Sequence, residues 1–259
     1  MNPYWTGAFF FLGAVFGSFA NVVIYRLPKN ESIAAPASHC QKCKAPIKFY
    51  DNVPILSWFI LRGKCRSCGI SFSFRYCLIE ILTGVLFALA FAKLGWSWFL
   101  LEVLILFLGL VIVSFIDLDH FIIPDKISLP GIAIGLIGGL LNSERGFIDA
   151  LFGMLLGGGF LWAVAYIYYL LKKEEGMGGG DIKLLAWIGA VLGWKSVPFI
   201  ILGSSILGSV VGLFLIWKQK GNLKTVIPFG PYIALAAIIY LLIGQEIAKW
   251  YLNLFMPWA

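Results

Sequence analysis

Two short segments of the sequence combine aspartates with residues that could place them in an active site. Three aspartates lie within residues 117–125, and Asp181 closes the glycine-rich string 176–181. Two carboxylates held close together share one proton, so that the ionised one activates water while the protonated one polarises a peptide carbonyl. These segments therefore predict aspartyl peptide hydrolysis.

The residues alone leave open which aspartate pairs with Asp181. Asp117 and Asp119 are two positions apart, which is about 200° of rotation on a helix, so they cannot both face one partner. Asp125 follows Pro124 and precedes an apolar run, and we expect it to cap the next helix. The choice therefore lies between Asp117 and Asp119.

The glycines before Asp181 suit a protease. Gly178, Gly179 and Gly180 lack a Cβ, so they would let an extended substrate backbone approach and let the chain unwind before the helix. Unwound backbone at membrane depth is tolerated only where protein buries it or where it lines a water-filled cavity. We expect such a cavity to admit the hydrolytic water.

Four cysteines form a second candidate site. Cys40 with Cys43, and Cys65 with Cys68, are two C-x-x-C pairs separated by 21 residues. Four thiolates on two tight turns can hold a structural Zn²⁺ tetrahedrally. Two disulfides or four unrelated thiols are the alternatives, and a reducing compartment disfavours disulfides. We expect Cys77, the fifth cysteine, to be an apolar packing residue.

The elements that carry these sites are apolar. The chain has 259 residues, of which 60% are hydrophobic and 13% charged, and its mean hydropathy is +0.90. This composition excludes a soluble single domain and predicts an all-α polytopic membrane protein. About eight apolar runs are expected to cross the lipid bilayer: Trp5–Tyr25, Tyr76–Ala92, Trp96–Ile116, Ile127–Leu141, Ala150–Leu171, Ile182–Trp194, Ser196–Trp217 and Thr225–Gln245.

Charge predicts the orientation. If the N-terminus is outside, sixteen of the 20 Lys and Arg fall in inner segments, as the positive-inside rule requires, and both termini are outside. The net charge of +7 then reports topology, and we expect no nucleic-acid partner. Three units are expected: residues 1–25 as a retained first helix, 26–75 as a cytoplasmic zinc-binding module, and 76–259 as the protease core. The two short runs, at 127–141 and 182–194, both follow aspartates.

Taken together, the motifs resemble the bacterial type IV prepilin peptidases, a family of inner-membrane aspartic proteases that also methylate their product. The resemblance covers nearly the whole chain. The segments that carry it are residues 17–22, 26–28, 40–43, 52–58, 63–68, 75–76, 80, 117–125, 178–186 and 228–232.

The resemblance implies a catalytic pair and a reaction. Asp117 and Asp181 would be the dyad, cutting the basic leader from type IV prepilins and type II secretion pseudopilins at the cytoplasmic face of the bacterial inner membrane. The new N-terminal residue would then be methylated with S-adenosylmethionine. Gly178 and Gly180 would support the substrate-binding loop, and Lys183 would lie beside it.

The methyl-donor site is less sharply indicated. No glycine-rich nucleotide-binding signature occurs. The family resemblance implies that the cysteine module takes part, which makes Gly63 and Lys64 candidates, although a turn beside zinc ligands explains them equally well. Glu80 is expected to pair with Arg75 or Lys183, or to touch the substrate amine.

Two other functions remain open. A Gly-x-Gly-Asp protease without methyltransferase activity would share the aspartates but have no use for the cysteine module. A transporter with a zinc-binding loop would place its polar residues near the bilayer midplane, whereas the aspartates here cluster at the inner boundary. The sequence does not indicate an oligomeric state.

Overall fold

The computed structural model describes residues 3–142, 145–174, 177–219, 227–244 and 246–247. Within those ranges the chain is helical and forms no strand beyond two isolated bridges, His39 with Pro46 and Lys64 with Ser71. The main helices are α1 (Pro3–Arg26), α3 (Arg75–Leu94), α4 (Trp98–His120), α5 (Asp125–Leu141), α6 (Phe147–Lys172), α7 (Gly179–Leu192), α8 (Ser196–Gln219) and α9 (Gly230–Ile239), which continues as a π-helical turn, Tyr240–Gly244. Between α1 and α3 lie two 3₁₀ turns, Leu27–Lys29 and Phe49–Asp51, and the short α2 (Leu56–Ile60).

The all-helical membrane architecture expected from composition is confirmed. Five of the helices in the described ranges are long and apolar enough to cross a bilayer: α1, α3, α4, α6 and α8. The two runs predicted to be short are indeed short, because α5 has 17 residues and α7 has 14. The count of eight spans stays a prediction, as do the orientation and the three units, and the start of the last expected run lies outside the described residues.

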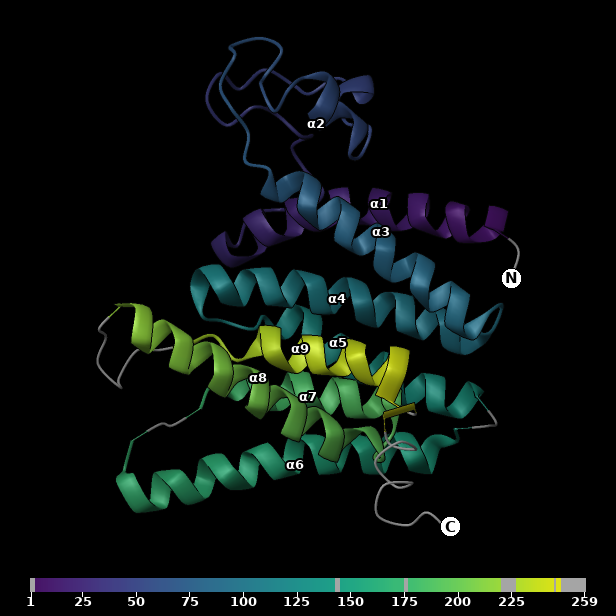
Figure 1. Ribbon diagram of the computed structural model, residues 1–259, viewed down its shortest axis with the longest axis vertical. Helices are drawn as coiled ribbons and strands as arrows, with labels where there is room; N and C mark the ends of the chain where they lie inside the picture. The colour runs from purple at the N-terminus through teal and green to yellow at the C-terminus, as the bar shows by residue number, and fades with distance from the viewer. Residues whose placement is uncertain (1–2, 143–144, 175–176, 220–226, 245, 248–259) are drawn as a thin grey trace.

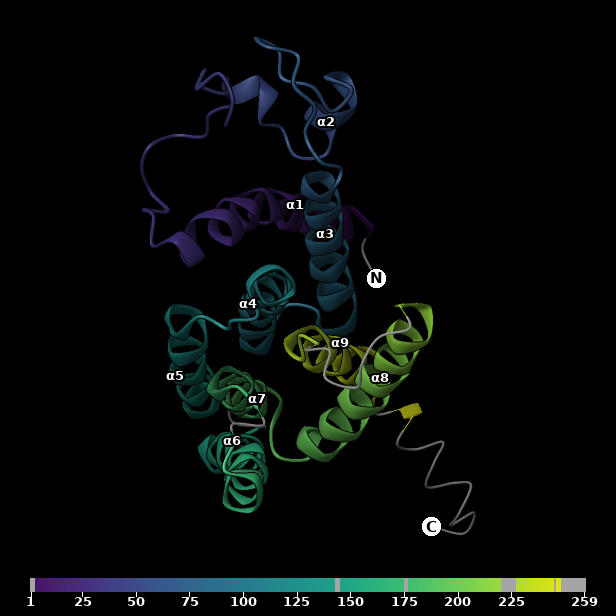
Figure 2. The same ribbon diagram turned by 90° about the vertical axis from the view of Figure 1, so that its left-hand side faces the viewer.

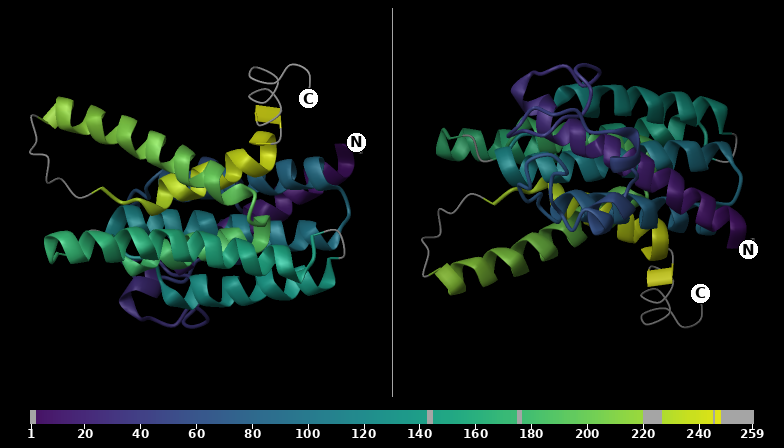
Figure 3. Two further views of the ribbon diagram at one scale, coloured as in Figure 1. Left: turned by 90° about the horizontal axis from the view of Figure 1, so that it is seen from below. Right: turned by 90° about the horizontal axis from the view of Figure 1, so that it is seen from above.

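The helices are arranged in successive layers beside the cysteine module. Figures 1 and 2 show the module on one face of the α1–α3 pair and α4 on the opposite face. Beyond α4 lie α5, α7 and α9, and then α6 and α8. In both views of Figure 3, α8 leans away from the other helices toward its C-terminal end. α4 therefore lies at the centre and contacts the helices of both halves.

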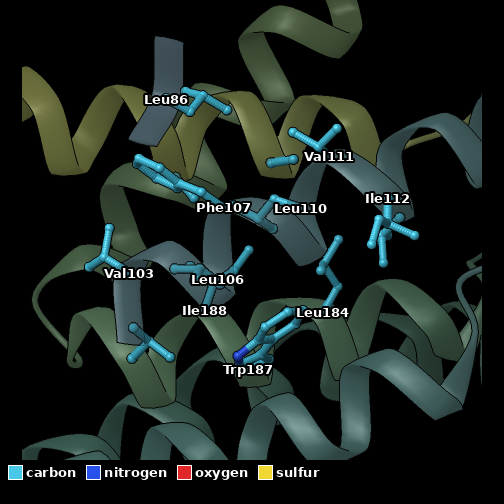
Figure 4. Packing of buried hydrophobic residues seen from close by; sticks show 14 of the residues in the cluster. Leu86, Val103, Leu106, Phe107, Leu110, Val111, Ile112, Leu184, Trp187 and Ile188 are labelled. Atoms are coloured by element: carbon cyan, nitrogen blue, oxygen red, sulfur yellow. The ribbon is translucent and has the colours of Figure 1, made fainter. Parts of the chain in front are cut away.

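The α4–α7 contact matters most for the aspartates, because α4 carries Asp117 and α7 carries Asp181. Figure 4 shows Leu106 and Leu110 of α4 facing Leu184 and Trp187 of α7, and all four side chains are buried. Trp187 also packs where Gly109 of α4 and Gly131 of α5 have no side chain. Close packing of this kind fixes the rotation and depth of both helices.

A buried ion pair fixes the other end of the same helices. Arg145, in the loop before α6, lies 2.8 Å from Glu102 of α4, and both side chains are 8% exposed. The Arg145 guanidinium also donates to the carbonyl oxygens of Gly135 in α5, at 2.9 Å, and of Val191 in α7. One side chain thus ties α4, α5 and α7 together at the end remote from the aspartates.

Candidate active site and metal centre

Asp117 lies in the last turn of α4 and is only 5% exposed. Its Oδ2 accepts a hydrogen bond of 2.9 Å from the backbone N–H of Gly230, the first residue of α9. This contact joins segments 113 residues apart. Asp117 is therefore held at a junction between the end of α4 and the start of α9.

Asp181 lies in the first turn of α7, and the structure brings it to the same cluster. Its carboxylate interacts electrostatically with that of Asp117. Its Oδ1 is buried and has no hydrogen-bond partner. A carboxylate oxygen in this state is available to a water or to a substrate carbonyl.

The structure separates Asp117 from Asp119, as the rotation argument requires. Asp119 is directed to the protein surface and forms an ion pair of 2.7 Å with Arg75 at the start of α3. Arg75 also donates to the carbonyl oxygen of Phe115. Of the two candidates, only Asp117 is buried and interacts electrostatically with Asp181.

The capping role expected for Asp125 is wrong. The N-cap of α5 is Pro124, which makes no side-chain capping bond, and Asp125 is the first helical residue. Its carboxylate instead accepts a 2.6 Å hydrogen bond from Lys183 of α7. The pair links the first turns of α5 and α7, two positions after Asp181 along α7.

The glycine string unwinds less than expected. Gly178 is extended and serves as the N-cap of α7, but Gly179 and Gly180 already belong to the helix. Gly180 is packed closely, since a Cβ at this position would lie 2.7 Å from the Cβ of Ile123. The prediction of an unwound chain therefore holds only up to Gly178. At Gly180 the lack of a side chain lets the α4–α5 loop, through Ile123, pack closely against α7.

Sequence reasoning assigned no role to Gly230, although it noted the surrounding segment 228–232. A Cβ on Gly230 would lie 2.8 Å from Asp117 Oδ2 and 3.2 Å from Ile123 Cδ1. Ile123 thus packs between the starts of α7 and α9. The glycine flanked by two prolines, Pro228 and Pro231, was the signal that could have pointed to this position.

The four cysteines form a compact cluster. The Sγ atoms of Cys40, Cys43, Cys65 and Cys68 all lie within 4.8 Å of one another, and those of Cys40 and Cys68 are 3.8 Å apart. Tetrahedral coordination with Zn–S bonds of about 2.3 Å requires sulfur atoms about 3.8 Å apart. None of the four is in a disulfide. The residues present therefore fit a structural zinc ion.

Both C-x-x-C turns have the same backbone pattern. In the first, Cys40 N–H donates to Ala45 and Lys44 N–H donates back to Cys40; in the second, Cys65 N–H donates to Ile70 and Gly69 N–H donates back to Cys65. Backbone hydrogen bonds, first that of Cys43, and neighbouring thiols lower the pKa of the Cys40 thiol to about 6, against the effect of desolvation. At Cys68 a backbone hydrogen bond at Ile70 is outweighed by desolvation and the neighbouring thiols, which raise the pKa to about 11. The thiolate form that a metal requires is therefore reached most easily at Cys40.

Comparison with known proteins assigns the chain. The profile of the bacterial peptidase A24 N-terminal domain matches residues 11–94, and that of the type IV leader peptidase family matches residues 104–213. A prepilin leader peptidase/N-methyltransferase of Aeromonas hydrophila is 39% identical, the alignment covering 95% of this chain and 93% of the relative. The proteins of the same name from Aeromonas salmonicida and Pseudomonas aeruginosa are 38% and 37% identical and are covered to 92% and 91%.

The chain belongs to the type IV leader peptidase family. No solved structure matches it significantly. The N-terminal profile of this family member includes the cysteine module and α3, and the second profile includes both members of the aspartate pair.

Glu80 of this leader peptidase does not form either of the ion pairs expected for it. Arg75 pairs with Asp119 and Lys183 pairs with Asp125, so both cations are engaged elsewhere. Glu80 is buried in α3 and accepts a 2.7 Å hydrogen bond from the backbone N–H of Ile55, at the start of α2. The carboxylate thus joins the membrane helix to the cysteine module.

Gly63 and Lys64 lie at the edge of the cysteine module. Gly63 has φ +64°, and a Cβ there would lie 3.1 Å from the Trp58 ring, so the position requires glycine both for its backbone and for its space. Lys64 is exposed and forms a bridge with Ser71. Cys77 is fully buried in α3, as expected for a packing residue.

Proposed function

We propose that this protein removes the leader peptide from type IV prepilins and type II secretion pseudopilins at the cytoplasmic face of the inner membrane, and then methylates the new N-terminus. The observation that carries the hydrolytic half is that Asp117, which is buried, and Asp181, which is half-buried, come from helices remote in sequence and interact electrostatically. The relatives are named prepilin leader peptidase/N-methyltransferase, which supports both halves.

Hydrolysis follows from the environments of the two carboxylates. One of them, ionised, takes a proton from the attacking water, while the other, protonated, donates to the oxygen of the scissile carbonyl. Gly230 N–H holds Asp117 in place, and the Oδ1 of Asp181 has no hydrogen-bond partner that would compete with the reacting groups. Collapse of the tetrahedral intermediate then releases the leader and leaves a free amine on the pilin.

The position of the dyad fits the substrate. Asp117 is in the last turn of a membrane-spanning helix, so the scissile bond would lie at the boundary between lipid and water. A basic leader stays in the cytoplasm while the apolar pilin helix remains in the bilayer. Lys183 and Asp125 neutralise each other beside the first turn of α7, and Gly178 leaves room for an extended substrate backbone.

The methyl-transfer half involves the cysteine module. Cys40, Cys43, Cys65 and Cys68 would hold a structural zinc ion that stabilises a segment with little core of its own. S-adenosylmethionine, when bound, supplies the methyl group. Gly63 packs against the Trp58 ring in the same module. Gly63 and its neighbour Lys64 are our candidates for the methyl-donor site.

The test combines a prepilin substrate, the purified protein in lipid, and S-adenosylmethionine, with mass analysis of the product. We expect loss of the leader and a gain of one CH₂ group. Asp117→Asn and Asp181→Asn should each abolish cleavage, while the matched control Asp119→Asn, at an exposed carboxylate on the same helix end, should retain it.

Two outcomes would contradict the proposal. Cleavage retained by either dyad variant would refute the assignment of the pair. Cleavage by the wild-type protein without the mass gain would favour the protease that lacks methyltransferase activity.

A further inference from the structure

A large cavity lies between the cysteine module and the helices α1 and α3. Its volume is about 610 Å³, which is within the range of small-molecule sites. Its walls come from α1 (Asn21), α3 (Tyr76, Glu80) and the module (Trp58, Gly63). Its lining includes neither Asp117 nor Asp181, and the module and α4 lie on opposite faces of the α1–α3 pair (Figure 2). It is therefore a separate site from the dyad.

The cavity wall contains a buried carboxylate without a counter-ion. Glu80 is 9% exposed, and it has no ion-pair partner among the residues that the structure describes. Its hydrogen bonds come from neutral donors, the backbone N–H of Ile55 at 2.7 Å and the hydroxyl of Ser18. By contrast, Asp51 in the same wall is paired with Arg66 at 2.5 Å.

Other groups in the wall favour an organic ligand with a polar edge. Trp58 presents an aromatic ring, held edge-to-face against Phe74 at 5.1 Å, and its Nε1–H is buried without a partner. Arg26, itself buried, donates to the carbonyl oxygens of Ser32 and Pro36 and so ties the loop after α1 to the cavity rim. The cavity is thus built from ordered parts on three sides.

Burying an anion is costly unless a cation accompanies it. Arg26, Lys48 and Lys64 also line the cavity, but none of them pairs with Glu80 in the part of the chain that the structure describes, so a cationic ligand is the natural source. We propose that this cavity binds S-adenosylmethionine and that Glu80 recognises the positively charged sulfonium. This inference rests on the proposed methyl-transfer function and assigns it a site.

The charge of the methyl donor changes in the reaction, and Glu80 would therefore also affect release of the spent donor. The neutral amine of the cleaved pilin, having released a proton to water, forms a bond to the methyl carbon, and the carbon–sulfur bond breaks with its electron pair left on sulfur. The product amine becomes a methylated ammonium, and the spent donor becomes a neutral thioether. Its attraction to Glu80 is then lost, which favours its exchange for a fresh donor.

The experiment is calorimetric titration of the full-length protein in lipid nanodiscs with S-adenosylmethionine and, separately, with the uncharged S-adenosylhomocysteine. In Glu80→Gln the amide oxygen still accepts from Ile55 N–H, so the variant removes the charge and keeps the contact. We expect it to lower affinity for S-adenosylmethionine about tenfold, which suits one partly screened charge pair, and to leave S-adenosylhomocysteine binding within twofold. Glu80→Asp, which keeps the charge, should retain the preference for the sulfonium.

Glu174→Gln is the matched control, because Glu174 is exposed after α6 and outside the cavity. It should change neither affinity. Equal weakening of both ligands by Glu80→Gln would overturn the proposal, since it would show a structural role only, and so would unchanged affinity for both. Methylation by the wild-type protein, measured separately, distinguishes a wrong assignment of Glu80 from a failure of the proposed function.

Discussion

Replacing Gly230 with alanine tests whether the start of α9 positions the catalytic carboxylate. The backbone of Gly230 is not in the left-handed region, so its φ does not exclude alanine. The added methyl group would nevertheless lie 2.8 Å from Asp117 Oδ2 and 3.2 Å from Ile123 Cδ1. The added methyl group would therefore crowd mainly the Asp117 carboxylate.

The magnitude follows from these distances. Ordinary contact begins at 3.4 Å, so Asp117 Oδ2 must retreat by about 0.6 Å. A misplacement of about 1 Å at a reacting centre costs about 100-fold in rate, and we therefore expect cleavage to fall between about 10- and 100-fold. This is a barrier increase of about 1.4–2.7 kcal/mol. Stability should change little, because the closest atom is the end of the Asp117 side chain, which can move to relieve the crowding.

The assay is the initial rate of prepilin cleavage by purified Gly230→Ala, with thermal unfolding measured on the same sample. Gly208→Ala is the control, because a Cβ at Gly208 of α8 would make only an ordinary contact of 3.4 Å with the ring of Phe229, next to Gly230. A wild-type rate for Gly230→Ala would refute the reasoning, and so would an equal loss in Gly208→Ala.

Three further predictions concern parts of the fold away from the dyad. Cys40→Ser should lower the zinc content of the purified protein below one ion per chain and reduce methylation more than cleavage, as metal analysis and the prepilin assay would show. Arg145→Ala should lower the free energy of unfolding by about 3–5 kcal/mol, because it leaves Glu102 buried and unpaired. The thermal midpoint should fall accordingly, and an unchanged midpoint would contradict this prediction. Arg66, through its hydrogen bonds to Asp51, lowers the pKa of that carboxyl, so its stabilising effect is present above the ordinary pKa and is lost as the pH falls through the lowered one. Module unfolding followed by fluorescence should therefore depend less on acid in Asp51→Asn than in the wild type.

The helices were largely predictable because lipid imposes a simple rule on sequence. A chain that crosses hydrocarbon must be apolar over about 20 residues, and the run predicted at 76–92 became a helix at 75–94. Even the shortness of α5 and α7 was evident, because charged residues interrupt the apolar runs. Helix boundaries in this chain depend mainly on local composition.

The partners of the polar side chains were less predictable, because they depend on packing between distant segments. Asp125 bonds Lys183, 58 residues away, and so does not cap its own helix. Glu80 accepts a hydrogen bond from the backbone N–H of Ile55, and a backbone donor of this kind cannot be recognised from residue types. The Gly230 contact to Asp117 involves a main-chain donor, and a sequence does not show where such a donor points. The clustering of the four cysteines Cys40, Cys43, Cys65 and Cys68, by contrast, was predictable, because the C-x-x-C spacing and the chemistry of thiolate ligands can be recognised locally in the sequence.

The arrangement of α3 bears on how two reactions can share one chain. Its first residue, Arg75, holds Asp119 beside the dyad, while Glu80 lies in the wall of the cavity on the other face. These residues are only about 8 Å apart along the helix axis, but the cavity that Glu80 lines includes neither Arg75 nor the dyad. A bound methyl donor would then not touch the scissile bond, and hydrolysis must come first because it creates the amine that is methylated. The order of the two reactions follows from chemistry, and α3 joins their sites without merging them.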